Sequence, residues 1–178
     1  DESCADAVRA QRLAVDGGLV WVDPLHRGKT RAALDPLLRD VAAQGPFVSA
    51  HPDTILKLGV KEMLYHTRHL GRGSDTRLYR SAAEFRAAFP AALRTAGPRV
   101  LKQNRGNGGQ GVWKVELLSE RVPALVRVLE AQRGSVPEEW ALDYVSRQVE
   151  RYFGWGGAII DQVFQPRLPE GMIRCYIG

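Results

Sequence analysis

Residues 99–117 read RVLKQNRGNGGQGVWKVEL, and this stretch decides the fold that we expect. Two apolar runs flank a loop in which four of the six residues from 106 to 111 are glycine. Glycine tolerates positive φ and lets the backbone approach a ligand, so successive N–H groups can line a concavity that holds phosphate oxygens. Lys102 and Arg105 add positive charge beside it. The pattern predicts two strands joined by an anion-binding hairpin. Its glycines are Gly106, Gly108, Gly109 and Gly111.

Three well-known types of glycine loop do not fit this context. The Walker loop needs G-K-[ST] after its glycines, whereas Val112 and Trp113 follow Gly111. The spacing G-x-G-x-x-G is formally present, but the dinucleotide-binding form precedes a helix and here a strand is expected. The protein-kinase form requires an H-R-D segment and a D-F-G segment, and the sequence contains neither. A glycine-rich hairpin without a ligand stays open as the alternative.

The same stretch resembles the ATP-grasp superfamily, in which a strand carrying lysine leads into a flexible glycine loop and a second strand. Residues 100–104 are similar to the family's V-V-K-P strand, with Gln103 in place of proline, and residues 104–112 are similar to its G-x-G-x-G-V loop. The resemblance implies an α/β (α+β) protein with an ATP-grasp-like two-lobed fold, incomplete in this chain. It also implies that the nucleotide lies between the lobes.

Three further segments follow in the family's order. Lys61 resembles the earlier family lysine, which contacts the α-phosphate; taken alone, it reads better as an exposed helical lysine. Residues 159–164 resemble the hinge strand, whose backbone reads the adenine edge, or a plain buried strand. Residues 172–176 resemble a strand whose arginine, here Arg174, points at the terminal phosphates. Glu170 could face the ribose hydroxyls.

These matches imply a set of site residues and a reaction. In the family, ATP phosphorylates a carboxylate, and an amine or thiol attacks the acyl phosphate, as in a carboxylate–amine or carboxylate–thiol ligase. The resemblance implies catalytic roles for Lys102 and Arg174. It implies nucleotide contacts from Lys61, Lys102, Arg105, Gly106, Gly108, Gly109, Gly111, Asp161, Gln162 and Phe164.

The family binds magnesium through acidic residues and an asparagine that follow the arginine strand. The sequence ends at Gly178, so we expect ATP and magnesium as cofactors but no metal ligand within this chain. A polyphosphate site without its metal binds loosely, because the ion neutralises phosphate charge. We therefore expect the chain alone to be weakly active or inactive, and to be a piece of a longer protein. The alternative is a non-catalytic nucleotide-binding module.

The pattern of apolar runs and turns predicts an interleaved order of elements. Short strands are expected at 19–22 and 47–50, a helical stretch at 51–70, a strand at 78–79 and a helix opened by the S-x-x-E capping box of Ser81. A longer helix is expected from 137 to 153. We expect three parts: a preceding α/β region at 1–50, a first ATP-grasp lobe at 51–98, and a glycine-loop lobe with the hinge strands at 99–178.

Composition narrows the class of protein. The 178 residues are 44% hydrophobic and 25% charged, which is ordinary for a globular protein, and no uncharged apolar stretch could cross a membrane. Two cysteines, the absence of an apolar leader and the lack of C-x-x-C pairs favour a cytoplasmic setting. The net charge of +5 is scattered, so nucleic acid is a less favoured partner than ATP and an unknown carboxylate substrate. His66 and His69 read as surface residues, and a homodimer is left open.

Overall fold

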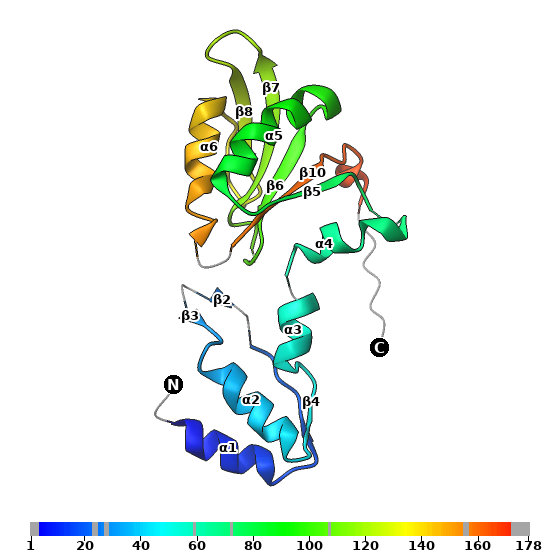
Figure 1. The fold of residues 1–178 in the computed structure, drawn as a ribbon, viewed down its shortest axis with the longest axis vertical. Coiled ribbons are helices and arrows are strands. Elements are labelled where there is room, and N and C mark those ends of the chain that lie inside the picture. Colours follow the sequence, from blue (N-terminus) through cyan, green and yellow to red (C-terminus); the bar gives the residue numbers. More distant parts are fainter. Residues whose placement is uncertain are drawn as a thin grey trace.

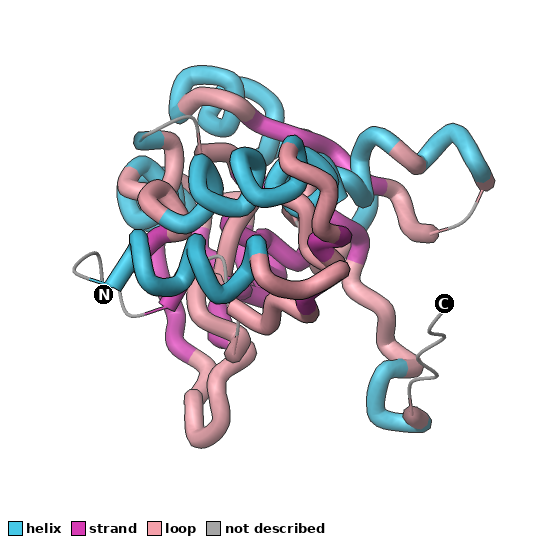
Figure 2. Tube along the Cα trace, turned by 90° about the horizontal axis from the view of Figure 1, so that it is seen from below, coloured by secondary structure: helices cyan, strands magenta, loops and turns pink. Residues whose placement is uncertain are grey.

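A computed structural model shows an elongated molecule with a helical N-terminal part and a larger sheet-containing part (Figure 1). Seen from below, the helices of the N-terminal part lie in front of the strands (Figure 2). In the described residues, no helix has the length and apolar character needed to cross a membrane. The structure describes residues 4–22, 25–26, 29–58, 60–71, 73–106, 108–154 and 157–171.

The N-terminal part is a small helical layer on a short parallel pair of strands. Strands β1 and β4 pair in parallel, and α2 packs on β4 and on α1. Leu38, Val41 and Val48 are its buried core. Its elements are α1 (Ala5–Leu13), β1 (Gly17–Gly18), β2 (Leu25–His26), β3 (Lys29–Thr30), α2 (Leu34–Ala43) and β4 (Phe47–Val48).

A chain of short helices leads from this layer to the large sheet. The expected helical stretch at 51–70 is present as three pieces. They are α3 (Pro52–Leu58), α4 (Met63–His66) and the 3-10 turn η2 (Arg68–Leu70). The interruption falls where the sequence has Gly59, which lies outside the described residues. Helix α4 contacts the first strand of the sheet, so it lies at the edge of the larger part.

The larger part is a six-stranded antiparallel sheet in the order β5-β10-β6-β7-β8-β9. Strand β10, the last strand of the described chain, inserts between β5 and β6. The strands are β5 (Thr76–Tyr79), β6 (Arg99–Gln103), β7 (Val112–Ser119), β8 (Leu125–Glu130), β9 (Glu138–Ala141) and β10 (Ile159–Val163). The 3-10 turn η4 (Leu168–Glu170) follows. The sheet thus joins β5, from the expected 51–98 part, to strands from the 99–178 part.

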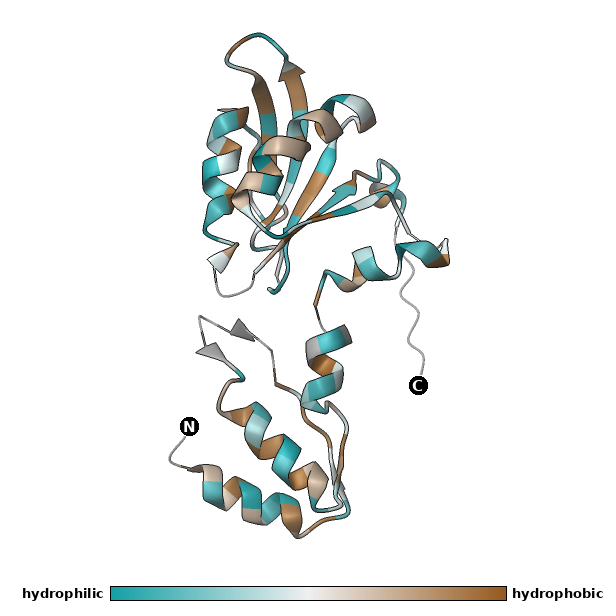
Figure 3. Ribbon diagram, viewed as in Figure 1, coloured by the Kyte–Doolittle hydropathy of each residue, from teal (hydrophilic) through white to brown (hydrophobic). Residues whose placement is uncertain are grey.

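One face of the sheet is covered by α5 (Ala82–Ala96) and α6 (Leu142–Glu150) (Figure 1). Their buried side chains pack with those of the strands in one apolar core. Hydrophobic residues lie along β7 and β8 (Figure 3). The expected capping box opens α5, since the Glu84 amide donates to Ser81 Oγ over 3.1 Å. Glu84 in turn accepts from the amide of Arg80 rather than from that of Ser81.

Because side chains alternate along a strand, the register assigns each residue to one face. Leu101 and Trp113 are paired and buried in the core beneath the helices. Lys102 is next to Leu101 in sequence and therefore lies on the opposite, open face, paired with Val112 and Ile160. The loop between β6 and β7 closes this strand pair.

Two expected elements are wrong. Residues 19–22 form no strand: Leu19 is 83% and Trp21 100% exposed, because the parallel pairing stops at Gly18. Side chains provide the contacts beyond that point, since Ser49 Oγ accepts from the Val20 amide and Arg12 donates to the Leu19 carbonyl. The expected helix at 137–153 begins only at Leu142. Residues 138–141 instead pair with β8 as an edge strand, so tertiary pairing overrides the helical pattern.

Candidate functional site

The glycine loop adopts the backbone conformations that its sequence suggests. Gly106, Gly108, Gly109 and Gly111 all have positive φ, between 61° and 142°. An L-residue pays a steric penalty in this region, so the loop depends on glycine at these positions. The loop starts directly after Lys102 and Gln103 at the end of β6 and returns into β7.

Packing explains part of this glycine requirement. The side chain of Gln103 lies inside the loop, where its Nε2 donates to the Gln110 carbonyl over 2.8 Å. A Cβ on Gly111 would come within 2.8 Å of Gln103 Cδ, and a Cβ on Gly106 would also press on this side chain. Gln103, which replaces the family proline, therefore fills the base of the loop. Several amides around the loop have protein partners: Gly111 donates to Glu130 Oε1 over 3.1 Å, Asn104 donates to the Ala158 carbonyl, and Val112 and Gln103 donate within the hairpin.

Gly109 and Gly108 differ in their surroundings. A Cβ on Gly109 would overlap the carbonyl oxygen of Ala131, whereas a Cβ on Gly108 would meet nothing within 4 Å. Gly108 is also exposed. The tip near Gly108 is thus the part of the described loop whose backbone is open to a ligand.

Lys61 lies against this loop although it comes from a distant part of the chain. Its ammonium donates to the Gly106 carbonyl over 2.8 Å. Its backbone amide donates to the carbonyl of Asn104 over 3.0 Å. Lys61 is therefore fixed at both ends to the start of the loop, at the N-terminal side of α4.

Lys102 belongs to a second polar cluster on the open face of the sheet. Its ammonium donates to Gln162 Oε1 over 2.6 Å. The amide nitrogen of Gln162 donates in turn to Thr76 Oγ1 over 3.0 Å and to Ser74 Oγ over 3.3 Å. This chain of bonds fixes the orientation of the Gln162 amide and leaves its oxygen facing the lysine.

Both lysines are partly desolvated and lie near each other. Burial lowers the pKa of the Lys61 ammonium, and repulsion from Lys102 lowers that pKa further. Burial also lowers the pKa of Lys102. Partial removal from water strengthens the attraction of each ammonium for an anion, since the local dielectric constant is lower. The two side chains together form a cationic site beside the loop.

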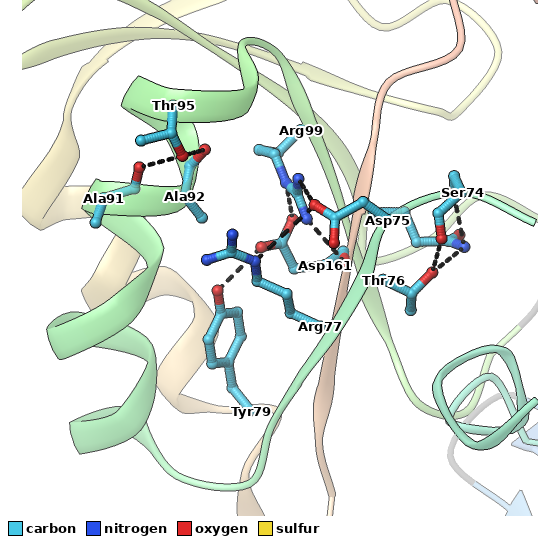
Figure 4. Close-up of polar contacts among 11 residues, drawn as sticks. Ser74, Asp75, Thr76, Arg77, Tyr79, Ala91, Ala92, Thr95, Arg99 and Asp161 are labelled. Carbon is cyan, nitrogen blue, oxygen red and sulfur yellow. Dashed lines mark hydrogen bonds and ion pairs between the residues drawn. The ribbon is translucent and has the colours of Figure 1, made fainter. Parts of the chain in front are cut away.

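Asp161 does not join the lysines. Its side chain is buried on the helix-covered face, where Arg99 Nε donates to it over 2.6 Å and the Tyr79 hydroxyl over 3.0 Å (Figure 4). Arg99 also donates to Asp75 over 2.6 Å. Burial raises the pKa of the Asp161 carboxyl, while the bonds from Arg99 and Tyr79 oppose that rise. The carboxylate is bonded to side chains in the protein interior. Any nucleotide contact of Asp161 would therefore have to come from its backbone.

Phe164 lies just beyond β10, where the hinge is expected. Its amide donates to the Pro98 carbonyl over 2.9 Å. The ammonium of Lys114, on β7, lies 4.3 Å from the centroid of the Phe164 ring, a cation–π contact. Lys114 is paired with Val100, so it shares the open face with Lys102.

The remaining residues predicted from the sequence have no described hydrogen bond or ion pair with Lys61, Lys102 or Phe164. Arg105 is exposed at the start of the loop. Glu170 binds Arg167 over 2.7 Å in η4. Arg174, with the expected strand at 172–177, lies outside the described residues. Sequence reasoning assigned no site role to Asn104, Lys114, Thr76 or Ser74. Asn104 and Lys114 lie inside the quoted stretch 99–117, but their types and positions in that stretch do not indicate which distant groups they meet.

The described residues contain no group of three or more His, Cys, Asp or Glu side chains that could hold a metal ion. Two lysine ammonium groups lie beside the loop, and the groups that accept from them are the Gly106 carbonyl and the Gln162 side-chain oxygen. Ammonium donors suit phosphate oxygens.

Comparison with known proteins bears on the fold of the chain. No protein-family profile matches the sequence, and no curated protein matches it. Among solved structures, D-cycloserine synthetase DcsG aligns with a TM-score of 0.56 and 18% identity over 86% of this chain and 45% of that protein. A RimK-domain ATP-grasp protein from Sphaerobacter thermophilus DSM 20745 aligns with a TM-score of 0.43 and 19% identity, over 85% of this chain and 46% of that protein. The chain has an ATP-grasp-like fold and spans less than half the length of these structures.

Proposed function

We propose that this chain binds ATP on the open face of the six-stranded sheet, with the triphosphate held between Lys61, Lys102 and the tip of the glycine loop. The observation that carries the proposal is the meeting of two segments far apart in sequence, the one with Lys61 and the one with Lys102 and the loop. Lys61 donates to the Gly106 carbonyl, and Lys102 lies close enough to lower the pKa of Lys61 further. Two partly buried cations beside a glycine-rich hairpin are costly for stability, and an anion offsets that cost.

The residues of the chain would act by position and charge. The ammonium groups of Lys61 and Lys102 would each exchange a protein oxygen, on Gly106 and Gln162 respectively, for a phosphate oxygen. The exposed backbone near Gly108 would cover the phosphates, with Arg105 adding charge. No nucleophilic side chain is needed, because electrostatic stabilisation and orientation are the main contributions of proteins to phosphoryl transfer.

The base would lie toward the end of β10. Phe164 would pack on the ring, and backbone groups near the end of this strand would read the adenine edge. Lys114, which now lies over the Phe164 ring, would have to move aside or stack on the base. Gln162 would connect the two regions, since it lies on β10 and binds Lys102.

The reaction proposed for the whole protein is that of an ATP-dependent carboxylate ligase, in which an amine or thiol attacks an acyl phosphate. Its support is the ATP-grasp-like fold and the similarity to a synthetase. Arg174 would assist at the terminal phosphates. Because the chain spans less than half of the similar structures, the carboxylate, the nucleophile and the magnesium ligands are left unassigned.

A non-catalytic nucleotide-binding module is the second candidate. It is favoured by the carboxylate of Glu130, which accepts a hydrogen bond from the Gly111 amide and brings negative charge to the loop. Turnover separates the two candidates: a ligase releases ADP and phosphate when its carboxylate and nucleophile are supplied, and a binder does not.

A thermal-shift titration with ATP and magnesium tests the proposal. A ligand that binds only the folded state stabilises it by about 2.7 kcal/mol at a concentration of 100 Kd, so the melting temperature must rise. Lys102→Ala should remove most of this shift. Lys57→Ala, which removes an exposed lysine of α3, is the matched control and should keep it. An unchanged melting temperature in the wild type, or equal shifts in wild type and Lys102→Ala, would refute the proposed site.

Salt separates ATP from nucleic acid as the ligand. A nucleic-acid complex held by many phosphate contacts weakens steeply as salt rises, because each contact releases counterions. The proposed ATP complex includes base and loop contacts and should show a much shallower salt dependence. A steep dependence, together with tight binding to duplex or single-stranded DNA, would favour the nucleic-acid alternative.

A further inference from the structure

Asn104 connects three segments at the base of the glycine loop. Its backbone amide donates to the Ala158 carbonyl, and its backbone carbonyl accepts from the Lys61 amide, each over 3.0 Å. Its side-chain oxygen accepts from the Glu62 amide over 2.9 Å. The residue is 8% exposed. A buried asparagine with its side chain committed to a distant backbone amide is a specific connection, because an unpaired buried amide is costly.

The partner segment is the one that presents Lys61. Glu62 is the residue before α4, so the bond from its amide to Asn104 fixes the first turn of that helix. Lys61 is then attached by its backbone to Asn104 and by its ammonium to Gly106, two residues further along the same loop. Lys61 and Asn104 thus link the start of α4 to the glycine loop, although these two segments are far apart in sequence.

We infer that Asn104 is a positioning residue for Lys61: its side-chain oxygen fixes the start of α4 so that the lysine ammonium points at the phosphate-binding loop. The inference rests on the proposed ATP site and adds a residue to it. A lysine side chain loses up to about 2 kcal/mol of rotamer freedom when it is fixed. Fixing its backbone beforehand reduces what must be ordered when the ligand binds.

Asn104 itself would not touch the nucleotide. Its side-chain oxygen is occupied by the Glu62 amide and it is nearly inaccessible to solvent. Its contribution to binding should therefore depend on Lys61 being present. This dependence distinguishes a positioning role from a general effect on the stability of the loop.

A double-mutant cycle on MgATP binding, measured by isothermal titration calorimetry in the purified protein, tests the inference. Asn104→Ala should weaken MgATP binding about 3- to 10-fold, the loss expected for one net hydrogen bond. Lys61→Ala should weaken it about 10-fold or more, because a charged partner is lost. The double variant should bind within about twofold of Lys61→Ala alone, since contacting residues are not additive.

Gln103→Ala is the matched control. It is adjacent to Asn104 and also loses one side-chain hydrogen bond, but that bond goes to Gln110 within the loop and not to the Lys61 segment. Its effect should add to that of Lys61→Ala. If Asn104→Ala does not fold, as judged by circular dichroism, Asn104→Ser replaces it: the side chain stays polar but ends one atom short of the Glu62 amide.

The outcomes separate this inference from the proposed function. If wild type binds MgATP and Lys102→Ala weakens it, but the effects of Asn104→Ala and Lys61→Ala multiply, the positioning role is overturned and the ATP site stands. An Asn104 variant that binds MgATP with wild-type affinity would overturn the positioning role in the same way. If wild type does not bind MgATP, the proposed function and this inference are both wrong.

Discussion

The two faces of the β6–β10 strand pair use neighbouring residues in opposite ways. On the covered face, Arg99 and Asp161 are both fully buried and bind each other. On the open face, Lys102 binds the neutral oxygen of Gln162, the residue directly after Asp161. Both pairs join β6 to β10. Side chains alternate along each strand, so the two pairs lie on opposite faces of the sheet.

The difference lies in what neutralises each cation. Arg99 has two carboxylates as partners, Asp161 and Asp75, so its charge is balanced within the protein. Lys102 binds an amide oxygen, and its positive charge lowers the pKa of Lys61. A cation whose charge is balanced internally contributes to the fold, whereas one left unbalanced and partly buried is available to an anionic ligand.

The largest expected effect comes from breaking the covered pair. Arg99→Met removes the guanidinium that binds the buried carboxylate of Asp161, so the free energy of unfolding should fall by about 3–5 kcal/mol. Urea denaturation followed by circular dichroism measures it. The double variant Arg99→Met with Asp161→Leu removes the orphan charge and should recover much of the loss. A loss below about 1 kcal/mol in the single variant would contradict a structural role for this pair.

A substitution at the loop tests the open face with a matched pair of glycines. Both Gly108 and Gly109 have positive φ, but only at Gly109 would a methyl group overlap backbone, that of Ala131. Gly109→Ala should displace the loop and weaken MgATP binding by about 10-fold or more relative to Gly108→Ala. Calorimetric titration of both variants measures the ratio. Equal affinities would mean that the loop backbone does not hold the ligand.

A smaller change sharpens the contrast on the covered face. Tyr79→Phe removes the hydroxyl that donates to Asp161 but leaves Arg99 in place, so stability should fall by about 1 kcal/mol. Tyr144→Phe, at a side chain that is 39% exposed, is the control and should change stability by less than about 0.5 kcal/mol. Thermal and urea unfolding provide the values. A change in MgATP affinity with unchanged stability would place Tyr79 in the binding site and contradict the contrast between the faces.

The smallest effect is a pH dependence that only the open face should show. Because burial lowers the pKa values of Lys61 and Lys102, these groups lose their protons at lower pH than exposed lysines. Phosphate binding favours the protonated forms, so affinity is full below those pKa values and falls as the pH rises through them. Lys102→Arg keeps its proton and should flatten the decline in MgATP affinity. A profile that is the same in both proteins would exclude Lys102 as the titrating group.

The sequence predicted the strand–loop–strand unit because its signals are local. Glycines at the positions that need positive φ and the capping box of α5 could all be read within a few residues. The resemblance to ATP-grasp proteins rested on the same local features, and the fold agrees with it. The assignment of individual site residues stays a prediction, which the variants above test.

Contacts between distant segments could not be read in this way. Asn104 is one of several polar residues in the loop sequence, and only the folded chain brings its side chain to the Glu62 amide. Residues 138–141 carry a helical pattern but become an edge strand because β8 offers a partner. Gln103 was noted only as a departure from the family proline, whereas the structure shows that it fills the loop.

By itself, then, the amino-acid order determined where the backbone must turn through positive φ and which strands carry cations next to that turn. Tertiary structure decided which face of the sheet is covered by helices, and therefore which side chains of these strands are buried beneath them. Asp161 and Gln162 are adjacent in sequence, and alternation along β10 brings the first to Arg99 on the helix-covered face and the second to Lys102 on the open face. The physical reason is that a strand fixes only the alternation, while the helices that pack on the sheet determine which face loses its water.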